Sequence, residues 1–174
     1  MPDRLLAFYQ GDGFDSAGRL IPEVWSFDRD DLEWHHDFIQ WLFPLPQASR
    51  YNPDAPVLTP ETAAAFRASD DLRARVLWSL DMMLAFYGFE RVDGTIVPAA
   101  DFEARADDWA WPEDHNHLRL SRMIQSLDHL GLPAEARALR AALLEAARAL
   151  GPQRVSRGTV GHWRGLLRAA PEAP

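Results

Sequence analysis

The chain has 174 residues, of which 47% are hydrophobic and 25% are charged. This is the composition of an ordinary globular domain, and it excludes collagen-like and disordered chains. The net charge of -8 argues against nucleic-acid binding, because that affinity comes mostly from basic groups that neutralise phosphates. The sequence has no cysteine, which excludes disulfides, thiolate metal sites and cysteine nucleophiles.

The chain also lacks the long apolar segments that direct or anchor proteins at membranes. No apolar run approaches the ~18 residues that span a bilayer, so we expect no transmembrane segment. We expect no signal peptide in the first residues, because such a peptide has a basic end before an apolar stretch of ~7–15 residues. We therefore expect a cytoplasmic protein.

Proline, glycine and capping side chains divide the sequence into helices, while alternating strand segments are nearly absent. Thr59 and Pro60, for example, form a strong start signal. The expected helices span residues 3–9, 28–43, 60–68, 70–87, 101–109, 114–130, 133–150 and 159–169. We predict an all-α fold: a single domain over residues 1–174, built as a bundle of about seven helices.

The segment 32–43 is the most unusual part of the chain. Two apolar stripes would run along a helix here, and only Glu33, Asp37 and Gln40 would form a polar row. A helix that is apolar nearly all round is a buried helix. We therefore predict that this aromatic-rich helix is the centre on which the other helices pack.

A second helix, over residues 114–130, carries a row of polar side chains at helical spacing: His115, Arg119, Arg122, Ser126 and His129. If this row faces the central helix, Arg119 or Arg122 would meet Asp37 or Glu33 and form a structural ion pair. Alternatively, the arginines would line a cleft that binds the carboxylate or phosphate of a ligand. The binding residues of such a cleft would be His36, Gln40, Trp41, His115, Asn116, Arg119 and Arg122.

Catalytic and metal-binding patterns are weak. His35 and His36 are adjacent, and adjacent helical residues point about 100° apart, so they do not share one metal ion easily. The nucleophile elbow of serine hydrolases and the phosphate-binding loop are both missing. We expect no metal, no cofactor and no catalytic residues. An enzyme that uses His36 or His115 with Asp37 is kept as a weaker alternative.

Three motifs, found in order along the chain, resemble one known family. They are His-Asp-Phe-Ile-Gln-Trp-Leu-Phe-Pro at 36–44, Met-Leu-Ala-Phe-Tyr-Gly at 83–88, and His-Asn-His-Leu-Arg-Leu-Ser-Arg-Met-Ile at 115–124. Together they resemble the conserved region of the opioid growth factor receptor, over residues 5–135. The resemblance implies an all-α fold, and it gives no catalytic residues to carry over to this chain. This chain looks like the conserved domain alone, followed by a basic helical extension over 136–170.

Two functional hypotheses follow. The first is a binding module for a peptide or small molecule whose natural identity is unknown, with its site at the seven residues named above. The second is a protein–protein interaction scaffold without a pocket, which would use the basic end over 132–174. The apolar stripe of Leu139, Leu143, Ala146 and Leu150 would then contact a protein partner. The chain would be a monomer or a dimer in either case.

Overall fold

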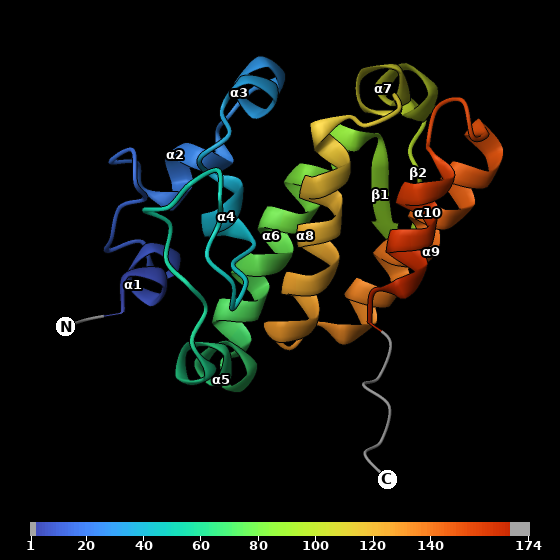
Figure 1. Ribbon diagram of the computed structural model, residues 1–174. Helices are drawn as coiled ribbons and strands as arrows, with labels where there is room; N and C mark the ends of the chain where they lie inside the picture. The colour runs from blue at the N-terminus through green and yellow to red at the C-terminus, as the bar shows by residue number, and fades with distance from the viewer. Residues whose placement is uncertain (1–2, 168–174) are drawn as a thin grey trace, which may run out of the picture.

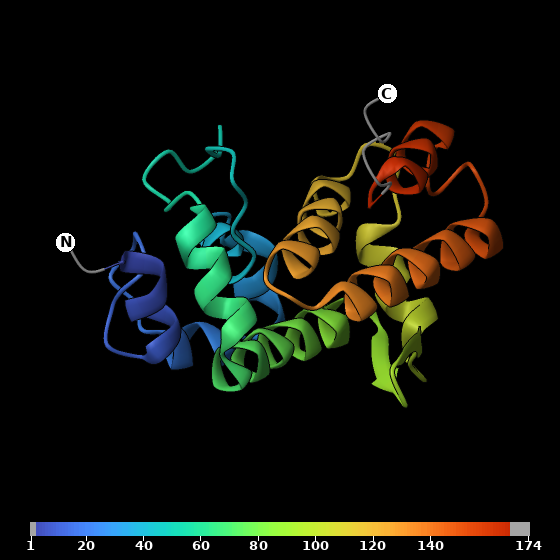
Figure 2. The same cartoon turned by 90° about the horizontal axis from the view of Figure 1, so that it is seen from below.

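The computed structural model describes residues 3–167, which form ten helices and one β-hairpin (Figure 1). The elements in chain order are α1 (Arg4–Gln10), α2 (Ile21–Trp25), α3 (Arg29–Trp34), α4 (Ile39–Leu42), α5 (Pro60–Ala68), α6 (Asp70–Tyr87), β1 (Phe89–Val92), β2 (Thr95–Pro98), α7 (Phe102–Trp109), α8 (His115–His129), α9 (Pro133–Leu150) and α10 (Arg157–Gly165). Helices α6 and α8 occupy the middle of the molecule. Helices α1–α5 lie on one side, and the hairpin with α7, α9 and α10 lies on the other (Figures 1 and 2).

Local signals in the sequence determine where the long helices begin and end. The side chains of Thr59 and Ser69 accept hydrogen bonds from the first turns of α5 and α6. Gly88 ends α6 in the left-handed conformation with a φ of 82°, which is accessible to glycine without steric cost. The helices expected over 60–68, 70–87 and 133–150 are confirmed with these bounds, and α8 differs from its expected bounds by one residue at each end. Helix α10 is shorter than the expected helix 159–169, whose last two residues lie outside the described part of the chain, as do residues 168–170 of the expected extension.

The prediction of an all-α fold with about seven helices is wrong. Strands β1 and β2 pair antiparallel, with Phe89 opposite Pro98 and Val92 opposite Thr95. The turn residues Asp93 and Gly94 both have positive φ, at 49° and 77°, as a tight two-residue hairpin turn requires. Each strand has only four residues, so the alternation is too short for a reliable strand pattern.

The predicted central helix over 28–43 is also wrong, because the chain breaks into α3, an irregular segment over residues 35–38, and the single turn α4. Trp34, expected inside, is 77% exposed, whereas Phe38 and Trp41 are fully buried. An uninterrupted helix would need the Leu32 and His35 carbonyls for its own hydrogen bonds. In this structure the side chain of Arg119 binds both carbonyls instead.

Aromatic side chains pack on both sides of the molecule and belong to one continuous core. On the α1 side, the ring of Phe8 meets Trp41 edge-on at 5.2 Å, and Tyr9 meets Phe66 at 4.9 Å. Near the hairpin, the buried Trp109 packs against the rings of Tyr87, Phe89 and Phe102. Edge-on pairs of this kind add to the stabilisation that burial provides. Within residues 3–167, no helix is both long enough and apolar enough to cross a bilayer.

Candidate functional site

A pocket of about 510 Å³ lies where four separate parts of the chain meet. Its volume is within the usual range for sites that bind small molecules. The α3–α4 junction and α4 contribute His36, Ile39 and Gln40, and the following loop contributes Leu45, Ala48, Ser49, Arg50 and Tyr51. Helix α8 contributes His115, Leu118, Arg119, Ser121, Arg122 and Gln125, and α10 contributes His162.

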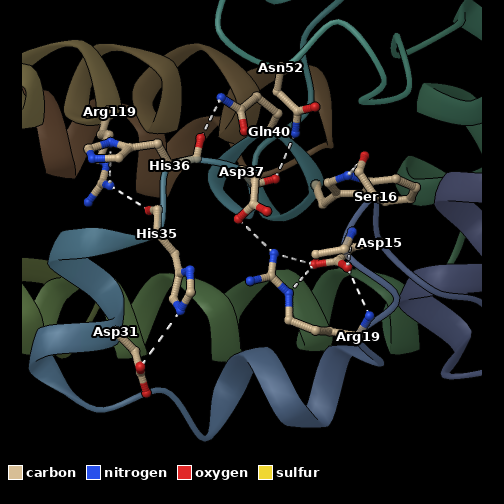
Figure 3. Close-up of polar contacts among 12 residues, drawn as sticks. Asp15, Ser16, Arg19, Asp31, His35, His36, Asp37, Gln40, Asn52 and Arg119 are labelled. Carbon is tan, nitrogen blue, oxygen red and sulfur yellow. Dashed lines mark hydrogen bonds and ion pairs between the residues drawn. The ribbon is translucent and has the colours of Figure 1, made fainter.

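Arg119 holds the α3–α4 junction against α8. Its side chain is 5% exposed and donates hydrogen bonds to the carbonyl oxygens of Leu32 at 2.6 Å and His35 at 2.8 Å. The guanidinium also lies 5.5 Å from the centre of the Phe38 ring, a cation–π contact. Figure 3 shows Arg119 directed at the backbone of residue 35. Arg119 therefore satisfies carbonyls that the end of α3 leaves without partners, and so fixes one wall of the pocket.

Helix α8 holds the start of the loop in the same way, one and two turns further on. Arg122 donates to the Phe43 carbonyl at 3.1 Å, and the Ser126 hydroxyl donates to the Pro44 carbonyl at 2.8 Å. The polar row predicted on α8 therefore does face segment 32–44, but its partners there are mostly backbone carbonyls. Burial lowers the pKa of Arg122 from its usual value, because the low-polarity surroundings disfavour the charged form.

The predicted ion pair of Arg119 or Arg122 with Asp37 or Glu33 does not form; Glu33 lies beside His115 instead. Asp37 Oδ1 accepts a hydrogen bond from Nη2 of Arg19 at 2.8 Å, and the same guanidinium binds Asp15 at 2.7 Å (Figure 3). Among residues 3–167, Arg119 and Arg122 form no ion pair with a carboxylate. Burial alone does not require an acidic partner for an arginine when several backbone carbonyls are within reach.

The two histidines of the junction, His35 and His36, have different neighbours. The His36 ring meets the His115 ring at 5.0 Å, beside the pocket, whereas His35 stacks on Phe27 and lies near Asp31. Burial lowers the pKa of His36, and the positive charge of Arg119 lowers it further. Within the described part of the chain, no three histidine or acidic side chains are grouped so that they could hold a metal ion.

Two polar atoms at the pocket are buried without a hydrogen-bond partner. Gln40 is 5% exposed, and its amide nitrogen donates to the His36 carbonyl at 3.2 Å, which leaves Oε1 as an unpartnered acceptor. His115 Nε2 has no hydrogen bond either, although the carboxylate of Glu33 lies 3.3 Å away. Buried polar atoms normally have partners, and of these two only Gln40 Oε1 has no partner group within the described chain, because His115 Nε2 is next to the Glu33 carboxylate.

Five of the seven predicted binding residues line this pocket: His36, Gln40, His115, Arg119 and Arg122. The other two do not line it. Trp41 is fully buried and donates to the Ser16 hydroxyl, and Asn116 is fully buried and accepts a hydrogen bond from the Tyr87 hydroxyl.

Sequence reasoning missed Arg50, Tyr51 and His162. Arg50 and Tyr51 belong to a loop without periodicity, and His162 is distant in sequence, so no local pattern could have identified them.

The family model and the similar proteins found for this chain all belong to one family. The family model described as the opioid growth factor receptor (OGFr) conserved region matches residues 7–156. The opioid growth factor receptors of Rattus norvegicus and Homo sapiens are 37% and 34% identical to this chain over 134 residues, which is 73% of its length. The opioid growth factor receptor-like protein 1 of Mus musculus is 34% identical over 72% of the chain.

The aligned part of the chain corresponds to only a minor share of these relatives, namely 23%, 20% and 28% of their respective lengths. No solved structure matches the chain.

Proposed function

We propose that the pocket binds a ligand, and the premise is that the chain belongs to the family of the opioid growth factor receptor conserved region. The relatives are named as receptors, which supports a binding role for the part that they share with this chain. Because the chain corresponds to about a quarter or less of those receptors, their own ligand is not transferred to it. The proposal concerns the pocket and the domain alone.

One observation carries the proposal: polar and apolar side chains from three distant stretches of the chain, within residues 36–51, within 115–125 and at 162, converge on one open pocket. Ligand sites commonly combine an apolar wall with a few polar groups that orient the ligand. Here Ile39 and Leu118 supply apolar surface, and Gln40 supplies a buried acceptor without a partner. Leu118 is 57% exposed and Tyr51 is 78% exposed, so the rim offers apolar contact that the fold itself does not use.

The alternative of a scaffold without a pocket receives less support. Three residues of the apolar stripe proposed as its contact surface, Leu139, Leu143 and Ala146, are buried. Helix α9 packs against α8, β2 and α10, which covers that stripe within the chain. The enzyme alternative also loses its proposed pair, because Asp37 binds Arg19 and not a histidine.

The test is native mass spectrometry of the protein purified from cells, with two matched variants. In Ala48→Trp, an indole placed on the exposed loop would fill the pocket, whereas Ala104→Trp places the same side chain on the exposed face of α7. We expect an additional mass on the wild-type chain and on Ala104→Trp, and its loss from Ala48→Trp. An additional mass that persists in Ala48→Trp, or none on the wild type, would contradict the proposal.

A further inference from the structure

The side chains around the pocket are basic, although the chain as a whole is acidic. Arginines 50, 119 and 122 and histidines 36, 115 and 162 line it, and none of the lining residues is an aspartate or glutamate. The net charge of the whole chain is -8. The carboxylates of Glu33 and Asp114 lie beside His115 at the α8 N-terminus, and Asp37, next to the lining residue His36, is paired with Arg19. The pocket therefore presents positive charge within an otherwise negative protein, a contrast that favours anions there.

The three arginines differ in how many hydrogen bonds their side chains already make within the chain. Both terminal nitrogens of Arg119 donate hydrogen bonds to backbone carbonyls, and one also donates to Asn116, so the role of Arg119 is structural. Arg122 has one hydrogen bond, to the Phe43 carbonyl, and Arg50 has no side-chain hydrogen bond or ion pair within residues 3–167. A half-buried guanidinium without a carboxylate partner retains several donors for an anion. Arg122 and Arg50 are therefore the two cations available to a ligand.

Gln40 adds a second requirement, because Oε1 can only accept a hydrogen bond. The orientation of its amide follows from the 3.2 Å bond of the nitrogen to the His36 carbonyl, since the reversed amide would set two oxygens against each other. A simple anion without hydrogen would leave Oε1 unpartnered. A ligand that carries an N–H or O–H group near its anionic group would satisfy both Gln40 and the arginines.

We infer that the ligand is a small organic oxyanion, a carboxylate or phosphate, with an adjacent N–H or O–H donor and an apolar body. The anionic group faces Arg122 and Arg50, the donor binds Gln40 Oε1, and the apolar body lies on Leu118 and Ile39. This inference rests on the proposed function, and it adds the chemical class of the ligand.

Four simple probes separate these contributions in calorimetric titrations. Hippurate has a carboxylate, an amide N–H and a phenyl ring. Hippuramide removes the charge, 3-benzoylpropionate replaces the N–H by a methylene group, and phenyl phosphate carries the alternative anion. We expect hippurate to bind about 10-fold more tightly than hippuramide and about 3-fold more tightly than 3-benzoylpropionate, as the usual strengths of charged and neutral hydrogen bonds imply. The ranking of 3-benzoylpropionate against phenyl phosphate, neither of which has an N–H donor, compares the two anionic groups.

Three variants locate the binding in the pocket. Arg122→Gln is expected to weaken hippurate binding about 10-fold, and Arg50→Gln about 3-fold, because Arg50 is more exposed. Arg157→Gln, an exposed site on α10 that does not line the pocket, is the control and should change nothing. Arg50 has no bond to the rest of residues 3–167, so its variant tests the inference even if Arg122→Gln unfolds.

Several results would overturn the inference. Equal affinity for hippurate and hippuramide would show that the anion does not matter, and unchanged binding in both pocket variants would place the probes elsewhere. Failure of both anions to bind in the millimolar range would also overturn it. The proposed function is tested separately: a co-purified ligand that is present on the wild type and lost from Ala48→Trp would still support it if the probes failed to bind.

Discussion

Replacing Arg119 by methionine tests whether this side chain holds the fold together at the α3–α4 junction. Methionine keeps a similar length and apolar stem, but it removes every donor. The Leu32 carbonyl, bound at 2.6 Å, and the His35 carbonyl, bound at 2.8 Å, would both lose their partner. The variant therefore isolates the hydrogen bonds of Arg119 from most of its packing.

The magnitude follows from the cost of leaving buried acceptors unpaired. Each such group costs about 1–3 kcal/mol, and the Arg119 side chain is 5% exposed, so water replaces the donors poorly. Two carbonyls give a loss of about 2–6 kcal/mol, a large part of the roughly 5–15 kcal/mol that stabilises a domain. For a chain of this size, where 1 kcal/mol corresponds to about 2–4 °C, the melting temperature should fall by about 4–20 °C.

Urea unfolding, followed by circular dichroism and tryptophan fluorescence, measures this loss. The exposed control Arg157→Met should change the free energy of unfolding by less than about 0.5 kcal/mol. Arg119→Lys should fall between wild type and Arg119→Met, because one ammonium group cannot span carbonyls that the planar guanidinium reaches together. A loss below about 1 kcal/mol in Arg119→Met would refute the reasoning, since water or a shifted junction would then satisfy the carbonyls.

Three further changes test other parts of the structure. Gly88→Ala should destabilise the chain by more than about 1 kcal/mol in urea unfolding, because φ is 82° and a Cβ would lie 2.8 Å from the Phe102 Cα; an unchanged midpoint would contradict this. Trp34→Ala should change the free energy of unfolding by less than about 0.5 kcal/mol, since Trp34 is 77% exposed. A loss as large as that for a buried tryptophan would instead support a buried central helix. Burial lowers the pKa of both His36 and His117 below 6.5, so the unfolded chain takes up protons first as the pH falls. Stability should therefore decline from pH 7 towards pH 5, and replacing His117 by glutamine should flatten that decline.

The sequence predicted the parts of the fold that local chemistry determines. Proline and serine or threonine caps mark the starts of α5, α6 and α9, and Gly88 marks the end of α6, so these helices could be read directly. The hairpin was missed because its strands have four residues each. The break between α3 and α4 was missed for a different reason: Arg119 lies more than 80 residues away from the carbonyls that it binds. Long-range hydrogen bonds leave no local pattern.

The candidate site was predicted to a similar extent. The spacing of Arg119, Arg122 and Ser126 indicated correctly which face of α8 meets segment 32–44. The spacing could not indicate that the partners are carbonyls, because backbone groups are identical at every position. Arg50 and His162 join the pocket only through the path of the folded chain.

The bond between Arg119 and the junction has a consequence for how a ligand would enter. Moving the α3–α4 junction away from α8 would break the buried hydrogen bonds of Arg119 to the Leu32 and His35 carbonyls, so this wall keeps its shape before any ligand arrives. A site that is already ordered loses little conformational entropy on binding. Another part of the lining is a loop whose residues Ala48, Arg50 and Tyr51 are exposed, so it is the part that can adjust. We therefore expect similar association rates for different ligands, because the rigid wall needs no rearrangement. Differences in affinity should arise mainly from the dissociation rates, which the loop would influence.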